Sequence, residues 1–275
     1  MKFDYQQVRL QEDYVFGSVM SDPKLCLKLI RLILPQLEID HIEMVERQKV
    51  VEDNYHSHGV RFDIYTRDDQ QNVYNIEMQV QNVGALVKRA RYYHGRMDSD
   101  NLPKNQDYRL LKPSYVIFIC LFDPFGRGLH KYEFSQLCSA DHSLSLNIGQ
   151  TTIFLNMKGV ANDVNLGLVN FLDFLDNKEV DDEYVNEIKQ KIDQCTSQQK
   201  WRSEYMDNKT HMLFHDMDIE EVTRKRVQKK VQNDYFKVIK EIFRCQAAGM
   251  TRDQIIEQLK RQFAFSNKDI EKLLP

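Results

Sequence analysis

Two carboxylates stand in neighbouring segments that otherwise have the pattern of sheet strands. Asp63 lies in VRFDIY, residues 60–65, and Glu77 lies in NVYNIEMQV, residues 72–80. Both segments alternate apolar and polar residues, and the turn-forming residues between them predict an antiparallel hairpin. Pairing of the two strands is expected to bring Asp63 beside Glu77 on one polar face, with Gln79 two residues further along that face.

Such a pair is suited to metal chemistry. Adjacent carboxylates repel each other unless one is protonated or a cation lies between them, and hard oxygen ligands favour Mg²⁺ or Mn²⁺. The main-chain carbonyl of Met78, between Glu77 and Gln79, is a further candidate ligand. A metal held there would polarise a phosphoryl oxygen and activate water, as phosphodiester hydrolysis requires. The same alternation also fits an ordinary sheet with a solvated polar face, so spacing alone does not decide.

Other segments accompany the hairpin in a fixed order along the chain. They are QEDYVFGSVM (11–20), KRARYYHGRMDSDNL (88–102), YVIFICLFDPFGRGLHKYEF (115–134) and IFLNMKG (153–159). With the hairpin, they resemble the PD-(D/E)XK nuclease superfamily, in particular the bacterial recombination-promoting nuclease and putative transposase family, over roughly residues 8–205. The resemblance implies a restriction-endonuclease-like core, an α/β fold with a mixed central sheet flanked by helices, and metal-dependent cleavage of DNA.

The resemblance also assigns roles by position. Asp63 matches the first aspartate of the motif and Glu77 its second acid, so both are expected to be catalytic and to bind the metal. Gln79 stands where the superfamily has Lys, a familiar variant in this family, and its amide can orient water or contact a phosphate. Asp13 matches an acidic position in the first helix and is expected to touch the metal through water, although an Asp at a helix start is commonly only a cap.

Two departures from the family pattern concern cations. Gly17 stands where a Lys often follows the Val-Phe pair, and His58 stands where a Lys commonly precedes the Gly-Val-Arg run. Either change removes a potential phosphate contact or moves it elsewhere, so the departures bear on activity more than on the fold. His56 and His58 lack a complementary His or Cys cluster, and a soft-metal site is therefore not predicted.

A locally basic segment follows the hairpin. Between residues 84 and 131, nine Lys and Arg stand against four Asp and Glu, although the whole chain has a net charge of -3. Apolar residues at helical spacing predict a helix over residues 85–98. Lys88, Arg89 and Arg91 on this helix are predicted to contact DNA phosphates beside the metal, and a solvated cationic face is the alternative.

The remaining elements complete an α/β plan. Residues 10–34 are predicted to be helical, and the apolar run at 114–122 predicts a central strand covered on both faces. Residues 151–157 are a further strand candidate, and the segment from residue 166 begins a helical region. Strands followed by helices, with a fully buried strand among them, indicate a helix-flanked sheet.

The domain organisation follows from length and charge. A chain of 275 residues with 42% apolar residues can form one sizeable domain with an appendage. We predict a nuclease-like domain over residues 1–205 and a charged helical region over residues 206–275. That region fits either a small DNA-binding motif or helices that pack and form a homo-oligomer. The second interpretation is favoured, because Glu257, Asp269 and Glu271 weaken a DNA-facing helix.

Several sequence patterns are missing, and their absence bears on the location of the protein and on other enzyme classes. The chain starts without a signal-peptide pattern and has no apolar stretch of ~18 residues that could span a bilayer, so a cytoplasmic protein without a membrane partner is predicted. Its five cysteines include no CxxC pair, which argues against a disulfide framework or a zinc knuckle. It also lacks the P-loop, HExxH, GxSxG and dinucleotide fingerprints.

The functional hypothesis is a Mg²⁺- or Mn²⁺-dependent DNA endonuclease associated with recombination, mobile elements or defence. The alternative is a catalytically inactive DNA-binding or protein-interaction module that retains the nuclease fold. Fold and motif do not choose among the biological pathways.

Overall fold

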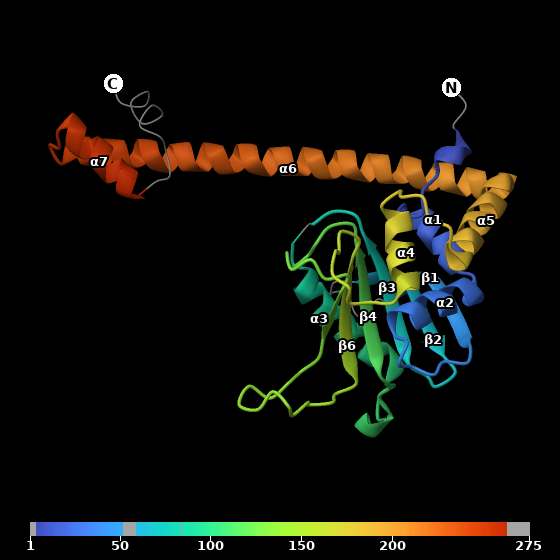
Figure 1. Cartoon of the computed structure of the whole chain (residues 1–275). Helices are drawn as coiled ribbons and strands as arrows, with labels where there is room; N and C mark the ends of the chain where they lie inside the picture. The colour runs from blue at the N-terminus through green and yellow to red at the C-terminus, as the bar shows by residue number, and fades with distance from the viewer. Residues whose placement is uncertain (1–3, 52–58, 83, 263–275) are drawn as a thin grey trace. The chain divides into compact units, whose positions relative to one another are not determined.

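The chain divides into two compact units, residues 1–205 and residues 206–275. The structure, a computed structural model, describes residues 4–51, 59–82 and 84–262 (Figure 1). The first unit contains a six-stranded mixed sheet with helices on both faces. This arrangement confirms the predicted α/β, restriction-endonuclease-like fold class.

The sheet has the strand order β1-β2-β3-β4-β6-β5. Its strands are β1 (Ile42–Val51), β2 (Val60–Asp68), β3 (Val73–Gln79), β4 (Ser114–Cys120), β5 (Lys131–Phe134) and β6 (Gln150–Asn156). The first three form an antiparallel meander, β3, β4 and β6 run parallel, and β5 pairs antiparallel with β6 at one edge. The predicted hairpin of β2 and β3 is present.

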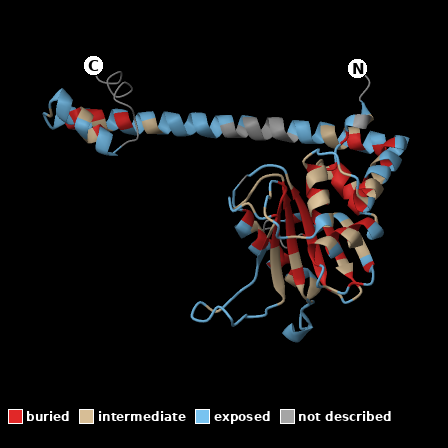
Figure 2. Ribbon diagram, viewed as in Figure 1, coloured by how far each residue is buried: buried red, intermediate tan, exposed pale blue. Residues whose placement is uncertain are grey.

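Burial explains the composition of the central strands. Six of the seven residues of β4 are buried, and so are six of the seven in β3. Parallel strands covered by helices on both faces carry apolar residues in succession, because both faces are dry. Figure 2 shows the buried residues of the first unit concentrated in the sheet and in the helix surfaces that face it. The prediction of a fully covered strand at 114–122 is confirmed.

Among the described residues, one group of helices lies on one face of the sheet and α3 (Leu86–Asn101) lies on the other (Figure 1). The group contains α1 (Asp13–Met20), α2 (Pro23–Ile33), α4 (Leu166–Leu175) and α5 (Glu183–Ser197). Asp22 separates α1 from α2 as the N-cap of α2. Its carboxylate accepts a hydrogen bond from the main-chain N–H of Lys24 at 3.0 Å, and Pro23 is the first residue of the helix. Short 3₁₀ helices cover Tyr5–Gln7 and Tyr108–Leu110.

The strand pairing is interrupted where Asp63 lies. Along β1 and β2 the pairs pass from Lys49 opposite Phe62 to Arg47 opposite Ile64, which leaves Asp63 outside the ladder. On the other side of β2, the pairs with β3 also end at Ile64. The sheet therefore opens between β2 and β3 at Asp63, whereas β1 and β2 keep the same register on both sides of this residue.

This interruption corrects one expectation from strand alternation. Strict period two placed Phe62 with Ile64 on the apolar face and Tyr65 with Asp63 on the polar face. In the structure, Phe62 and Tyr65 belong to the same core cluster beneath α3, and their rings stack with centroids 5.5 Å apart. The alternation fails between Phe62 and Tyr65, where the β2–β3 pairs end and Asp63 is left unpaired on both sides of β2.

A long helix, α6 (Gln199–Ala247), begins in the first unit and continues into the second. Its first turns belong to the first core: Trp201 stacks on Tyr205 at 5.1 Å, and its indole N–H donates to Ser18 Oγ at 2.9 Å. In the second unit, Gly249, with φ of +73°, follows α6, and α7 (Arg252–Gln262) begins three residues later. The apolar contacts of this helix pair are made by Val238, Ile242, Cys245, Ile255 and Leu259. Asp269 and Glu271 lie outside the described residues.

Candidate active site

The open point of the hairpin holds the two predicted carboxylates side by side. The main-chain N–H of Asp63 donates to Glu77 Oε1 at 3.1 Å, and the N–H of Met78 donates to Asp63 Oδ2 at 3.1 Å. Each carboxylate therefore accepts a hydrogen bond from a main-chain N–H of the opposite strand. These two bonds replace the main-chain hydrogen bonds that would otherwise join β2 and β3 here. Glu77 is buried at 3% exposure, and Asp63 is partly buried. The structure brings together the two residues that the hairpin pattern paired.

Burial and mutual repulsion govern the charge of this pair. Burial is the largest cause that raises the pKa of Asp63, to about 8, and the negative charges of Glu77 and Asp13 raise it further. Burial also raises the pKa of Glu77, against the opposing effects of the Asp63 amide and the Arg89 guanidinium. Without an added cation, the pair therefore retains a proton near neutral pH. Two desolvated carboxylates of this kind form a site that favours a bound cation.

Arg89 of α3 is the charged neighbour of the pair. Its Nη2 lies 3.0 Å from Glu77 Oε2, and its Nη1 donates to Gln79 Oε1 at 2.8 Å. The guanidinium lies over the rings of Tyr93 and Phe118, 5.3 and 5.4 Å from their centroids. Such stacking and forked donation are typical of Arg rather than Lys. Arg89 therefore acts as an internal counterion for Glu77 and fixes the orientation of the Gln79 amide.

This geometry explains how a glutamine is accommodated at the motif's usual Lys position. Gln79 accepts from Arg89 through its oxygen and donates from Nε2 to the carbonyl of Gln81 at 2.9 Å. A Lys at position 79 would place a second cation against Arg89. The positive charge beside Glu77 therefore comes from the helix rather than from the strand.

The three basic residues predicted on α3 lie in different surroundings. Lys88 and Arg91 are exposed, whereas Arg89 points inward to the carboxylates. Sequence reasoning treated the three alike and missed the inward contact. The signal was present in the spacing, because Arg89 lies four residues before buried Tyr93 and so shares its side of the helix.

Asp13 occupies the first turn of α1 and is partly buried. Burial raises its pKa against the opposing charge of Arg61, and its own charge contributes to the raised pKa of Asp63. Asp13 is not the N-cap of α1, because that position is taken by the preceding residue, Glu12. Asp13 therefore lies within electrostatic reach of the pair, and contact with a metal through water stays a prediction.

The donor set fits a metal that retains much of its water. Across the described ranges, no three His, Cys, Asp or Glu side chains converge as ready-made metal ligands. Mg²⁺ is commonly bound by one or two carboxylates with water in its other positions, which matches Asp63 and Glu77. The amide of Met78 already binds Asp63, and a role for its carbonyl as ligand stays a prediction.

The departure at Gly17 has a steric explanation. A Cβ at this position would lie 2.6 Å from Cδ of Arg47, whose side chain crosses Gly17 from β1. The Arg47 guanidinium lies 4.8 Å from the centroid of the Tyr14 ring and donates to Ser18 Oγ at 2.8 Å. Arg47 therefore occupies the space of a longer side chain at position 17 and supplies a cation there. His56 and His58 lie outside the described residues.

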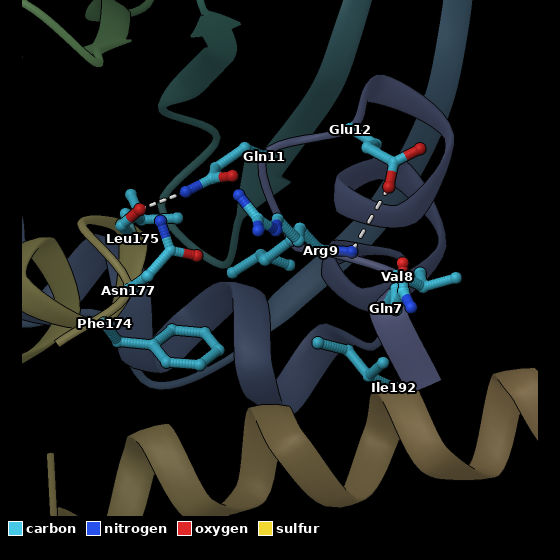
Figure 3. Close-up of a pocket in the computed structure, with 10 residues that line it drawn as sticks. Gln7, Val8, Arg9, Gln11, Glu12, Phe174, Leu175, Asn177 and Ile192 are labelled. Atoms are coloured by element: carbon cyan, nitrogen blue, oxygen red, sulfur yellow. Dashed lines mark hydrogen bonds between the residues drawn. The ribbon is translucent and has the colours of Figure 1, made fainter. Parts of the chain in front are cut away.

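A hollow of about 540 Å³ lies elsewhere on the first unit (Figure 3). It is formed by residues 7–12, the end of α4, Asn177 in the turn that follows α4, and Ile192 of α5. Arg9 donates its main-chain N–H to Glu12 Oε1 at 3.3 Å, and Gln11 donates its amide to the carbonyl of Leu175. These contacts tie the N-terminal segment to the helical layer, so we interpret the hollow as structural.

The fold and the paired carboxylates define a restriction-endonuclease-like domain. In agreement, the family model described as PD-(D/E)XK nuclease family transposase matches residues 10–242, and the chain belongs to this family. The matched range includes every predicted site residue and extends into α6. No curated protein and no solved structure gives a significant match. In the described part of the chain, no helix is long and apolar enough to cross a membrane.

Proposed function

We propose that this protein is a divalent-metal-dependent endonuclease that hydrolyses phosphodiester bonds in DNA and serves recombination, mobile elements or defence. Membership of the nuclease family supports the reaction class. The observation that carries the proposal is the Asp63–Glu77 pair, two desolvated carboxylates at an opening in the sheet. Burying two such groups together is costly unless a cation compensates them.

Each candidate residue has a distinct task in this proposal. When bound, Mg²⁺ or Mn²⁺ supplies a Lewis acid and lowers the pKa of a bound water. Asp63 and Glu77 would hold the ion, and the Met78 carbonyl and Asp13, the latter through water, would complete the protein's share of the ligands. The carboxylate pair retains a proton at neutral pH without metal, and the metal would compete with that proton, so metal affinity should increase with pH.

The neutral and cationic side chains act on the substrate. Gln79 positions the attacking water or a phosphate oxygen, and Arg89 holds the Gln79 amide in one orientation. Lys88 and Arg91, both exposed on α3, contact phosphates of the same DNA strand. Phosphate contacts of this kind position the strand without reading its sequence.

The decisive experiment is cleavage of supercoiled plasmid DNA by wild type, Asp63→Asn and Glu77→Gln. Both substitutions preserve side-chain shape and remove the charge. We expect nicking or linearisation by wild type with Mg²⁺ or Mn²⁺, none with chelator, and a loss of at least about 100-fold in both variants. Asp107→Asn, which alters an exposed carboxylate, is the matched control and should cleave as wild type. Undiminished cleavage by both site variants would refute the proposal.

One observation favours the alternative of a catalytically inactive DNA-binding or protein-interaction module. Arg89 already neutralises Glu77, and position 79 carries an amide instead of the motif's Lys. Such a module would bind DNA in a salt-sensitive manner, would show no Mg²⁺- or Mn²⁺-dependent stabilisation, and would cleave with neither metal.

Two broader predictions accompany the proposal. The second unit is expected to mediate homo-oligomerisation, and its α6 presents Phe236 and Phe243, both strongly exposed and seven residues apart on one side of the helix. A cytoplasmic location, predicted from the sequence, also belongs to this proposal. Sedimentation analysis of the whole chain and of Phe236→Ser/Phe243→Ser tests the first of these.

A further inference from the structure

A second hollow of about 430 Å³ lies beside α3, between this helix and strands β5 and β6. Three phenylalanines form one wall: Phe125 lies 5.1 Å from both Phe134 and Phe154, and Phe134 lies 5.9 Å from Phe154, measured between ring centroids. Phe154 is buried, whereas Phe134 is 46% exposed, so the aromatic wall continues to the surface at Phe134. A planar ring can therefore enter and stack.

Apart from Val87 and Ala90 of α3, the rest of the lining is polar and uncharged or positive. It includes Arg91 of α3 and the side chains of Gln136, Gln150 and Thr152. The floor is His94, whose ring nitrogens contact Ser114 Oγ at 2.8 Å and Thr152 Oγ1 at 3.0 Å, and burial lowers its pKa to about 4. Asp and Glu are missing from the described lining of this hollow. It therefore suits a ring with hydrogen-bonding edges, attached to an anionic group.

Arg91 is placed to receive that anionic group. It is exposed, and within residues 4–51, 59–82 and 84–262 its guanidinium makes no ion pair or hydrogen bond. Arg89, two residues earlier on the same helix, points to the carboxylate pair instead. Helix α3 thus directs one guanidinium to the candidate active site and another to the hollow.

The sheet register places the hollow close to the carboxylates. Glu77 of β3 lies opposite Phe118 of β4, which lies opposite Phe154 of β6. Neighbouring strands are about 4.8 Å apart, so Phe154 lies two strand spacings, or about 10 Å, from Glu77 along this row. One strand of DNA rises about 3.4 Å per nucleotide in a duplex, and the hollow is therefore within about three nucleotides of the carboxylates.

We propose that this hollow binds an unpaired nucleobase of the DNA strand that lies at the carboxylate pair. The base stacks on Phe134, its edge meets the glutamine and threonine side chains, and the adjoining phosphate contacts Arg91. The inference rests on the proposed nuclease function and deepens it by naming the substrate class. A base in a regular duplex must leave the stack to enter such a pocket, so single-stranded DNA, or a duplex with an unpaired base, is preferred.

An apolar peptide segment is the competing occupant, and the lining disfavours it. Gln150 and Thr152 already bind Asp98 and His94, but Arg91 and Gln136 would remain without hydrogen-bond partners against apolar side chains, which is costly. A base satisfies both parts of the site, because every base has a stacking face and polar edges.

The test measures binding in chelator, so that cleavage is not required. Fluorescence anisotropy compares three labelled probes of about 15 nucleotides: a single strand, the same strand with central abasic positions, and its fully paired duplex. We expect wild type to bind the single strand about 10-fold more tightly than the abasic strand. Phe134→Ala should lose that preference, and Arg91→Gln should weaken binding to both single strands.

Matched substitutions control for fold and charge. Tyr108→Ala removes another exposed ring, outside the hollow, and Lys104→Gln removes another exposed cation, so both should bind as wild type. A thermal unfolding curve confirms that Phe134→Ala is folded. The proposal is overturned by equal wild-type affinity for the base-bearing and abasic strands, or by a folded Phe134→Ala variant that retains the preference.

The result separates this inference from the proposed function. A protein that cleaves plasmid DNA but ignores the presence of bases would reject the pocket and leave the nuclease intact. A protein that binds base-bearing strands through Phe134 but cleaves with neither metal would support the pocket and reject the nuclease.

Discussion

Replacement of Arg89 tests the electrostatic design of the candidate site most directly. Arg89→Met keeps the apolar stem against Tyr93 and Phe118 but removes the cation that lies 3.0 Å from Glu77. Removal of one partner of a fully buried ion pair typically costs about 3–5 kcal/mol, because the other charge is left uncompensated. The Glu77 side chain is 4% exposed but that of Arg89 is 34% exposed, so solvent screening reduces the expected loss to about 2 kcal/mol.

A double-mutant cycle isolates this pair. Urea unfolding would be measured for wild type, Arg89→Met, Glu77→Gln and the double variant, each followed by fluorescence of the single tryptophan. Trp201 packs in the first unit, so its signal reports unfolding of the domain that holds the site. We expect Arg89→Met to cost about 2 kcal/mol in the wild-type background and under about 1 kcal/mol in the Glu77→Gln background.

The pH dependence adds a second criterion. Arg89 lowers the pKa of Glu77, so its removal moves the protonation of Glu77 to higher pH. The destabilisation by Arg89→Met should therefore shrink as the solution is acidified and Glu77 becomes neutral. Equal losses in both backgrounds, at every pH, would show that Arg89 stabilises the fold by packing alone, and the reasoning about the counterion would be wrong.

Two further predictions concern Asp63 and Gln79. The folded-state pKa of Asp63 is raised to about 8 from an ordinary value of 3.8, so the folded protein holds a proton that the unfolded chain releases between these values. Stability should therefore fall as pH rises from about 4 to about 8, and Asp63→Asn should flatten this slope in urea titrations; an unchanged slope would contradict the raised pKa. Gln79→Lys should cost about 1 kcal/mol more than the uncharged control Gln79→Met, because it places a cation against Arg89, and the difference should shrink at high salt. A fully salt-independent difference would show that sterics, not charge, excludes Lys.

Much of the plan could be predicted from local patterns in the sequence. Period-two alternation on both sides of a turn predicted the hairpin and the meeting of Asp63 with Glu77, and a continuous apolar run predicted the buried strand β4. These predictions hold because strand pairing through a short turn and burial on both faces depend on neighbours in the sequence. The helix break at Asp22 is equally local, since a capping carboxylate followed by Pro begins a new helix wherever it stands.

The tertiary structure decided how those residues are charged and surrounded. Asp63 is left out of the strand pairs on both sides of β2, and Phe62 and Tyr65 lie in one core cluster, neither of which alternation predicts. Three basic residues on α3 looked equivalent in the sequence, yet only the packing of the helix on the sheet turns Arg89 inward, to Glu77 and Gln79.

The same holds for contacts between distant segments. Arg47 of β1 fills the space beside Gly17 of α1. Phe125 comes from the loop before β5, Phe134 from β5 and Phe154 from β6, and only the folded sheet brings the three rings together. Sequence patterns therefore determined which residues form the strands, the helix faces and the acidic pair. Tertiary packing alone determined the partner of each charge and the shape of each hollow. These depend on contacts between segments that are far apart in the sequence, and no local pattern in either segment indicates the other.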